Sequence, residues 1–273
     1  MFSHKGKIIM KIGFIGCGNM ATAMLKGILK SGEVEASDMI ASAKSDKTRE
    51  KIEKELGIRK ADNNAQVVDF ADVVFLAVKP QFLEGVLDEI RGSVKAGQIF
   101  ISIAPGKTLQ WLGERLGENT KVIRTMPNTP AMVGEGMTAL CVNELITEEE
   151  TALAVKLCDT FGKTEVIPEH LMDAVVGVSG SSPAYVFMFL EAMADAAVAD
   201  GMPRAQAYKF AAQSVLGSAK LMQETGKHPG ELKDMVCSPA GTTIQAVRVL
   251  EEKGFRSAVI EAQTECVKKA KGM

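Results

Sequence analysis

The sequence has no surplus of charge of either sign and no cysteine cluster. It carries 32 Lys and Arg against 34 Asp and Glu, and the basic residues are scattered along the chain instead of forming a stripe. Because a nucleic-acid backbone is bound by a concentrated basic surface, we expect no nucleic-acid partner. The five cysteines are far apart, with no C-x-x-C pair and no neighbouring histidine. This spacing predicts reduced thiols in a cytoplasmic protein, without a disulfide or metal framework.

Long apolar runs are also missing. No segment reaches the roughly 18 uninterrupted apolar residues of a membrane-spanning helix, so we expect no membrane partner. Residues 1–9 lack the apolar core of a signal peptide, and we interpret them as a short extension outside the fold.

The length of 273 residues favours two domains, each with its own core. Short β-rich runs alternate with amphipathic stretches of helical length up to about residue 167, a pattern that predicts a parallel sheet with helices on both faces. The expected strands span residues 11–15, 39–42, 73–78, 99–103, 122–125, 137–142 and 165–167. We therefore expect an α/β domain over residues 10–168 and an all-α domain over residues 169–273.

One helix expected in the second domain, over residues 184–199, is apolar nearly all round, interrupted only by Glu191 and Asp195. A helix without a polar face must be buried on every side. A second subunit can supply that cover, so we predict a homodimer through the helical domain. The alternative is that this helix lies at the centre of a monomer.

A glycine motif follows the first expected strand. Gly16, Gly18 and Ala21 match the pattern G-x-G-x-x-A between a strand and a helix that ends near Gly32. In this pattern the first glycine permits a tight turn, the second lets a pyrophosphate approach the backbone, and the third small residue keeps the helix close to the sheet. The motif predicts a Rossmann-type doubly wound sheet that binds a dinucleotide, with a bland glycine turn as the alternative.

The end of the second expected strand bears on which dinucleotide is bound. An NAD enzyme normally places an acid there, whereas this chain has Ser42, Lys44 and Ser45, and Asp38 precedes the strand. Hydroxyls and a cation would accept a 2'-phosphate, so we expect NADPH, with NADH possible. Lys79 follows another strand, and we expect it either near the nicotinamide or in a surface salt bridge.

Two clusters of small residues occur in the helical half. In the first, residues 179–185, Ser182 and Pro183 are typical of a helix N-cap followed by proline in the first turn. In the second, residues 238–243, backbone amides and hydroxyls converge where a helix begins, an arrangement suited to a carboxylate.

These motifs together resemble the pyrroline-5-carboxylate reductase family. The resemblance extends from residue 11 to residue 271 and includes GFIGCGNMA at 13–21, AVKP at 77–80, MPNTP at 126–130 and HPGELKD at 228–234. It implies reduction of 1-pyrroline-5-carboxylate to L-proline, and dimers, in some members decamers, built through the helical domain. The chain has Ser182 where the family often has glycine, and Ala240 where it usually has glycine. The methyl group of Ala240 would crowd the carboxylate loop if position 240 needs a positive φ.

The resemblance also implies roles for individual residues. Thr243 would be the catalytic residue, hydrogen-bonded to the ring nitrogen. The substrate would be held by Glu169, Ser238, Gly241, Thr242 and Thr243. The cofactor would be held by Ile15, Gly16, Cys17, Gly18, Asn19, Met20, Ser42, Lys44, Asn64, Ala77, Val78, Lys79, Pro80, Ala104 and Pro105.

Histidine is scarce, and this fits imine chemistry better than carbonyl chemistry. None of His4, His170 and His228 lies in a motif expected to face the nicotinamide, whereas carbonyl reduction generally needs a general acid. A cyclic imine can be protonated before hydride arrives. A hydroxyl such as Thr243 would then suffice, although it could equally be a structural group at a helix N-terminus. Two alternatives are a β-hydroxyacid dehydrogenase, which should have a catalytic lysine after a glycine-rich segment, and a non-catalytic NADP(H)-binding regulator.

Overall fold

The computed structural model describes residues 10–272 and divides the chain into two compact units. One unit runs to Gly180 and takes up the chain again from Val267, and the other comprises Ser181–Cys266. The expected boundary at residues 168 and 169 lies earlier than this division and stays a prediction. The expected N-terminal extension, residues 1–9, and His4 within it lie outside the described residues.

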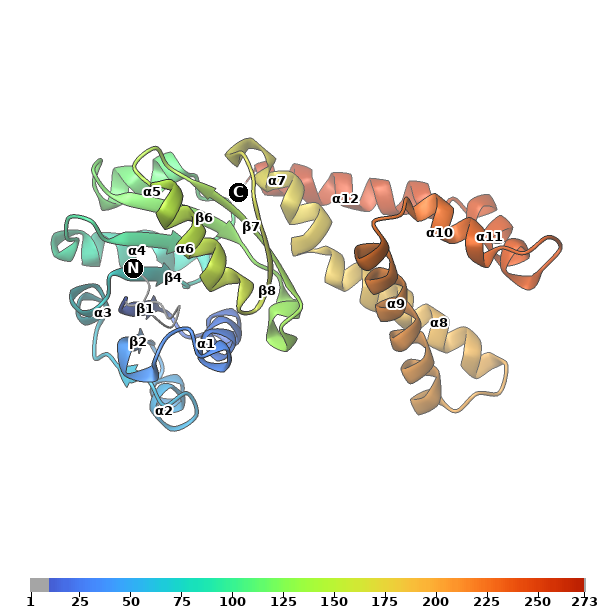
Figure 1. Ribbon diagram of the computed structural model, residues 1–273, viewed down its shortest axis with the longest axis horizontal. Coiled ribbons are helices and arrows are strands. Elements are labelled where there is room, and N and C mark those ends of the chain that lie inside the picture. The colour runs from blue at the N-terminus through green and yellow to red at the C-terminus, as the bar shows by residue number, and fades with distance from the viewer. Residues whose placement is uncertain (1–9, 273) are drawn as a thin grey trace. The chain divides into compact units, whose positions relative to one another are not determined.

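The first unit contains one eight-stranded sheet in the order β3-β2-β1-β4-β5-β6-β7-β8 (Figure 1). Its strands are β1 (Ile12–Ile15), β2 (Met39–Ser42), β3 (Arg59–Lys60), β4 (Val73–Leu76), β5 (Ile99–Ser102), β6 (Lys121–Met126), β7 (Gly136–Val142) and β8 (Gly162–Val166). All seven expected strands are present. The short strand β3 was not expected, because its two exposed basic residues carry no strand pattern.

The sheet is not wholly parallel, contrary to the expectation. Strands β1 to β6 are parallel, but β7 pairs with β6 in the antiparallel sense, with Arg124 opposite Cys141, and β8 is parallel to β7. A parallel connection needs a crossover of a dozen or more residues. Residues 127–135 are too few for one and contain only the 3-10 helix η3 (Thr129–Val133).

Helices cover both faces of the sheet (Figure 1). Those on one face are α1 (Asn19–Ser31), α2 (Asp46–Lys54) and α6 (Glu148–Asp159), and those on the other are α3 (Asn64–Phe70), α4 (Pro80–Ile90) and α5 (Leu109–Leu116). Phe14 and Phe75 stack in the first layer with ring centroids 4.5 Å apart, and Ile15 and Leu76 belong to the second. The doubly wound arrangement expected from consecutive apolar residues in the strands is confirmed.

The rest of the described chain is helical. A short helix α7 (Met172–Val175) and a π-helical turn (Val176–Gly180) precede α8 (Ser182–Ala199), followed by α9 (Arg204–Thr225), α10 (Pro229–Val236), α11 (Thr242–Glu252) and α12 (Phe255–Lys271). The expected N-cap at Ser182 is wrong. Helix α8 begins at Ser182, and the preceding Ser181 already has helical φ and ψ and forms no capping hydrogen bond, because the π turn leads directly into α8.

The helical unit has very little core of its own. Its buried apolar residues within the described chain are three alanines, Ala194, Ala207 and Ala211, whereas Phe187 and Met188 are 65% and 70% exposed. Helix α8 is therefore not the buried central helix of a monomer, which was the alternative to a homodimer. By length and composition the run Glu169–Ala199 would suffice to cross a membrane, with 6% of its most apolar window buried. The sequence criterion missed this run because charged residues interrupt it.

Candidate functional site

The residues expected to bind the dinucleotide meet at the carboxyl ends of the parallel strands. Ile15 ends β1, Ser42 ends β2, and Ala77 follows β4. The Gly16 amide donates to the Ser42 carbonyl at 3.1 Å, and the Ala77 amide donates to the Ile15 carbonyl at 2.8 Å. Strand β1 has β2 on one side and β4 on the other, which is the point where the strand order reverses and open α/β sheets bind ligands.

The glycine turn has the geometry that the motif predicts. Gly16 has φ +94°, and a Cβ there would lie 2.7 Å from the Ala77 carbonyl oxygen, so a side chain is excluded. A Cβ at Gly18 would meet no atom within 4 Å, so open space lies against the backbone at the start of α1. Asn19 and Met20 form the first turn of that helix. This open N-terminus fits a diphosphate.

Cys17, within the same turn, is part of the core. It is 4% exposed and its Sγ lies 3.9 Å from the Thr22 hydroxyl. Burial raises the pKa of its thiol above the ordinary value. Cys141 and Cys158 are likewise buried, and none of the five cysteines forms a disulfide within residues 10–272.

A pocket of about 490 Å³ opens beside this turn. Five expected cofactor residues line it: Gly16, Ser42, Lys44, Asn64 and Val78. It also contains Arg49, Phe82 and Glu89, which the sequence analysis did not identify. Arg49 could have been suspected, because an arginine near the end of the second strand often accompanies a 2'-phosphate. Nothing in the local sequence marks Glu89.

The other expected cofactor segments also follow strands. Ala104 is buried and its amide donates to the Ser102 hydroxyl at 3.3 Å, and Pro105 comes next at the end of β5. Lys79 precedes α4, with Pro80 in the first turn of that helix. Within the residues that the structure describes, no ion pair of Lys79 is found, and its place near the nicotinamide stays a prediction.

Glu169 is held by two groups of the first unit. Its Oε1 accepts from the backbone amide of Leu109 at 2.7 Å and from Nη1 of Arg124 at 2.9 Å. Arg124, in β6, is 6% exposed, whereas the Glu169 side chain is 30% exposed. The carboxylate therefore links the start of α5 to the middle of the sheet. Oε1 accepts both hydrogen bonds, so Oε2 is the oxygen that could bind a ligand.

The expected carboxylate loop, residues 238–243, is a tight turn at the start of α11 in the helical unit. The Gly241 amide donates to the Ser238 carbonyl at 3.0 Å, and Thr242 and Thr243 form the first turn of the helix. Ala240 has φ 57° and is the only described residue other than glycine with a positive φ. Position 240, where the family usually has glycine, therefore does need the conformation that glycine adopts most readily.

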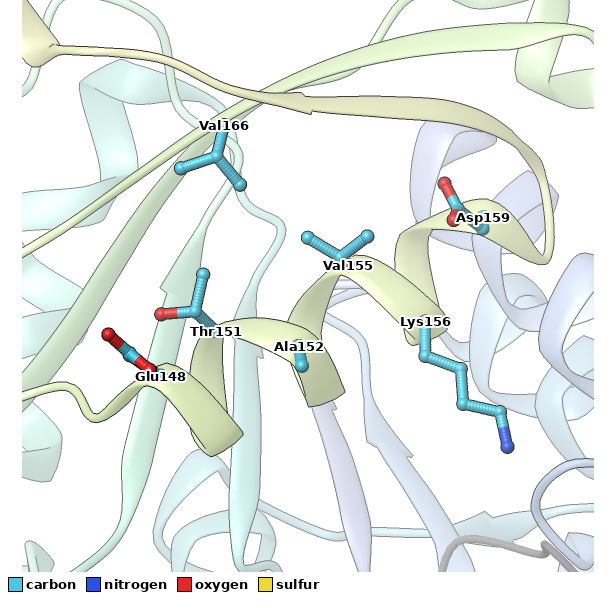
Figure 2. Close-up of a pocket in the computed structure, with 7 residues that line it drawn as sticks. All are labelled: Glu148, Thr151, Ala152, Val155, Lys156, Asp159 and Val166. Carbon is cyan, nitrogen blue, oxygen red and sulfur yellow. The ribbon is translucent and has the colours of Figure 1, made fainter.

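Two further features have no counterpart among the expected site residues. Figure 2 shows a pocket between α6 and β8, lined by Glu148, Thr151, Ala152, Val155, Lys156, Asp159 and Val166. None of the expected site residues lines it.

His228 caps α10, where its Nδ1 accepts from the Gly230 amide at 3.1 Å, and His170 lies in a 3-10 turn. No group of three or more potential metal ligands occurs within residues 10–272.

Known proteins match the whole of this arrangement. A family model described as pyrroline-5-carboxylate reductase dimerisation matches residues 169–273, and one described as NADP oxidoreductase, coenzyme F420-dependent, matches residues 11–106. The pyrroline-5-carboxylate reductase of Escherichia coli (strain K12) is 56% identical over 260 residues, which cover 95% of this chain and 97% of that protein.

Solved structures agree with the sequence comparisons. A pyrroline-5-carboxylate reductase from Coxiella burnetii has a TM-score of 0.91 at 32% identity and covers 97% of this chain and 98% of its own. Pyrroline carboxylate reductase of Plasmodium falciparum, solved with NADP bound, has a TM-score of 0.87 at 28% identity and covers 98% and 99%. The resemblance read from the motifs is confirmed, and the chain belongs to the pyrroline-5-carboxylate reductase family.

Proposed function

We propose that this enzyme reduces 1-pyrroline-5-carboxylate to L-proline with a nicotinamide dinucleotide, the last step of proline synthesis. The observation that carries the proposal is membership of the family over nearly the whole chain, which covers both the glycine turn and the carboxylate loop. The β-hydroxyacid dehydrogenase reading has no support of this kind. It would need a catalytic lysine after the small-residue segment 179–185, which has none.

The dinucleotide occupies the carboxyl edge of the sheet. Its diphosphate lies against the open backbone at Gly18, where the amides and the positive end of the α1 dipole favour an anion. The adenine-side ribose lies in the pocket that contains Ser42 and Asn64. The nicotinamide lies near Lys79, at the ends of β4 and β5. The remaining contacts proposed here are Ile15, Gly16, Cys17, Asn19, Met20, Lys44, Ala77, Val78, Pro80, Ala104 and Pro105.

The turn at residues 238–243 binds the carboxylate of the substrate. Ser238 offers its hydroxyl, and Gly241 and Thr242 offer backbone amides at the start of α11, where the helix dipole favours a negative charge. The hydroxyl oxygen of Thr243 accepts a hydrogen bond from the protonated ring nitrogen. Glu169 contributes Oε2 near the substrate while Oε1 stays bound to Arg124.

The chemistry asks little of the protein beyond orientation. The imine nitrogen is protonated before the reaction, so its carbon is already electrophilic, and the bound reduced nicotinamide supplies the hydride. The side chains then hold the ring, anchor its carboxylate and keep the nitrogen hydrogen-bonded. This explains why no histidine is placed as a general acid.

NADPH is the preferred form of the cofactor in this proposal. The preference is supported by the end of β2, which has no carboxylate, and by Asp38, which lies in a 3-10 turn before the strand. A carboxylate at the strand end would repel a 2'-phosphate, whereas Lys44 and Ser45 follow the strand here. NADH remains a possible second cofactor.

The oligomer is a homodimer through the helical unit. Exposed apolar side chains on α8 and α9, among them Phe187, Met188 and Phe210, would be covered by the same helices of a second copy. Five dimers are then arranged as a decamer, as the family resemblance implies. Free cysteines favour a cytoplasmic location, and the mixed surface charge offers no site for nucleic acid.

The proposal is tested by following reduced nicotinamide at 340 nm while 1-pyrroline-5-carboxylate is supplied. Thr243→Val should lower kcat/KM by roughly 10- to 100-fold, since a hydrogen bond to a charged group contributes about 1.5–3 kcal/mol. Thr243→Ser keeps the hydroxyl and should recover most of the loss. Tight cofactor binding without turnover of any cyclic imino acid would favour the non-catalytic regulator instead.

A further inference from the structure

Three side chains in the pocket beside the glycine turn form a hydrogen-bonded chain. Nδ2 of Asn64 donates to Oε2 of Glu89 at 2.7 Å, and Oδ1 of Asn64 accepts from the Ser42 hydroxyl, also at 2.7 Å. A carboxylate offers only acceptors, so it fixes the Asn64 amide with its NH₂ group toward Glu89. The amide oxygen must then face Ser42, and the single hydroxyl proton of Ser42 is used.

This chain decides what Ser42 can offer to a ligand. With its proton donated to Asn64, the buried Ser42 oxygen presents only lone pairs. A 2'-phosphate dianion also presents only acceptors, so the two cannot form a hydrogen bond. A ribose hydroxyl can donate to Ser42. The role expected of Ser42 from the sequence, as a donor to the phosphate, does not fit this geometry.

Arg49 has the geometry that Ser42 lacks. Its Nε donates to the Ala43 carbonyl at 2.7 Å, which fixes the guanidinium at the pocket wall and leaves its Nη groups for another partner. The nearest carboxylate oxygen, from Asp46, is 3.8 Å from Nη1, and the Asp46 side chain is 93% exposed. Such a contact is weak. A fixed guanidinium fork matches a phosphate in a bidentate manner.

The other charges that line the pocket leave room for an anion at Arg49. Lys44 adds a second cation, with Nζ 5.4 Å from the centroid of the Phe82 ring. Each of the two carboxylates already accepts a hydrogen bond. Glu89 accepts from Nδ2 of Asn64, and Asp62 accepts from the side-chain Nε2 of Gln66 at 3.4 Å.

We propose that Arg49 is the specificity-determining residue for NADPH in this enzyme. Glu89 is a positioning residue, which acts through Asn64 and makes Ser42 an acceptor for a ribose hydroxyl. The inference rests on the proposed function, because it requires the adenine-side ribose to lie in this pocket.

The experiment measures dissociation constants of NADPH and NADH from cofactor fluorescence, at fixed ionic strength, for the full chain and its variants. Arg49→Gln should raise the dissociation constant of NADPH roughly 10- to 100-fold, because a charge-assisted contact with the phosphate is lost. The dissociation constant of NADH should stay within about 2-fold of the wild-type value. Arg59→Gln is the matched control. Arg59 also donates its Nε to a carbonyl, that of Ser37 at 2.9 Å, but does not line the pocket, so neither constant should change.

Two further variants test the hydrogen-bonded chain. Ser42→Ala should weaken NADH at least as much as NADPH. Glu89→Leu frees the Asn64 amide to turn, so that Ser42 can donate, and it should raise the preference for NADPH over NADH by roughly 2- to 10-fold. Removing the negative charge of Glu89 would by itself also raise the preference for NADPH, but that effect does not depend on Ser42. The effect that passes through the Asn64 amide does. Measured against Ser42→Ala, the Glu89→Leu, Ser42→Ala double variant should therefore gain less preference for NADPH than Glu89→Leu gains over the wild type.

The possible failures are distinct. A wild-type protein that binds neither dinucleotide contradicts the proposed function itself. If both bind, an unchanged NADPH constant in Arg49→Gln overturns the assignment of Arg49. A loss of NADPH binding alone in Ser42→Ala, or a gain from Glu89→Leu that is equally large with and without Ser42, overturns the roles assigned to Ser42 and Glu89.

Discussion

Removal of the Glu169 carboxylate should destabilise the first unit. Glu169→Ala leaves the Arg124 guanidinium, in a residue 6% exposed, without its anion, and leaves the Leu109 amide without its acceptor. Breaking a buried ion pair costs about 3–5 kcal/mol. Because the Glu169 side chain is 30% exposed, water reaches part of the vacated space, and we expect a loss of about 2–3 kcal/mol in the free energy of unfolding.

Urea unfolding followed through tryptophan fluorescence measures this loss. Trp111, the only tryptophan, lies in α5 beside the helix start that Glu169 holds, so it reports on the first unit. Protein concentration must be fixed, because assembly contributes to stability. The matched control is Arg124→Met with Glu169→Leu, which removes both charges and should cost less than Glu169→Ala. A cost below about 0.5 kcal/mol for Glu169→Ala, together with a raised KM for the imine, would refute the pairing argument and make Glu169 a substrate ligand alone.

Two more outcomes follow from the helical unit. Ala240→Gly removes a left-handed alanine, whose strain is about 1 kcal/mol, and should lower the KM for the imine roughly 2- to 5-fold, while the greater freedom of unfolded glycine keeps the stability change below about 1 kcal/mol; a raised KM in steady-state kinetics would contradict this. Phe187→Asp places a charge on an exposed apolar face of α8 and should yield monomers in size-exclusion chromatography with light scattering, whereas a wild-type protein that is already monomeric at micromolar concentration would contradict the proposed dimer.

Local patterns determined much of this protein. Consecutive apolar residues such as those of β4 predicted strands covered on both faces, since a half-exposed strand would alternate. The glycine at position 16 predicted its turn because only a residue without Cβ fits there. The apolar surface of α8 predicted that the helix needs cover from outside the chain.

The tertiary structure decided what depends on contacts between distant segments. Arg124 meets Glu169 across 45 positions of the chain, and Asn64 meets Glu89 across 25, so no spacing rule indicates either contact. The apolar pattern of β7 does not show its direction, because parallel and antiparallel strands can have the same pattern, although the short connection of residues 127–135 favours an antiparallel strand. Periodicity reports which faces are buried, whereas the partner of a polar side chain is fixed only when the sheet brings the two segments together.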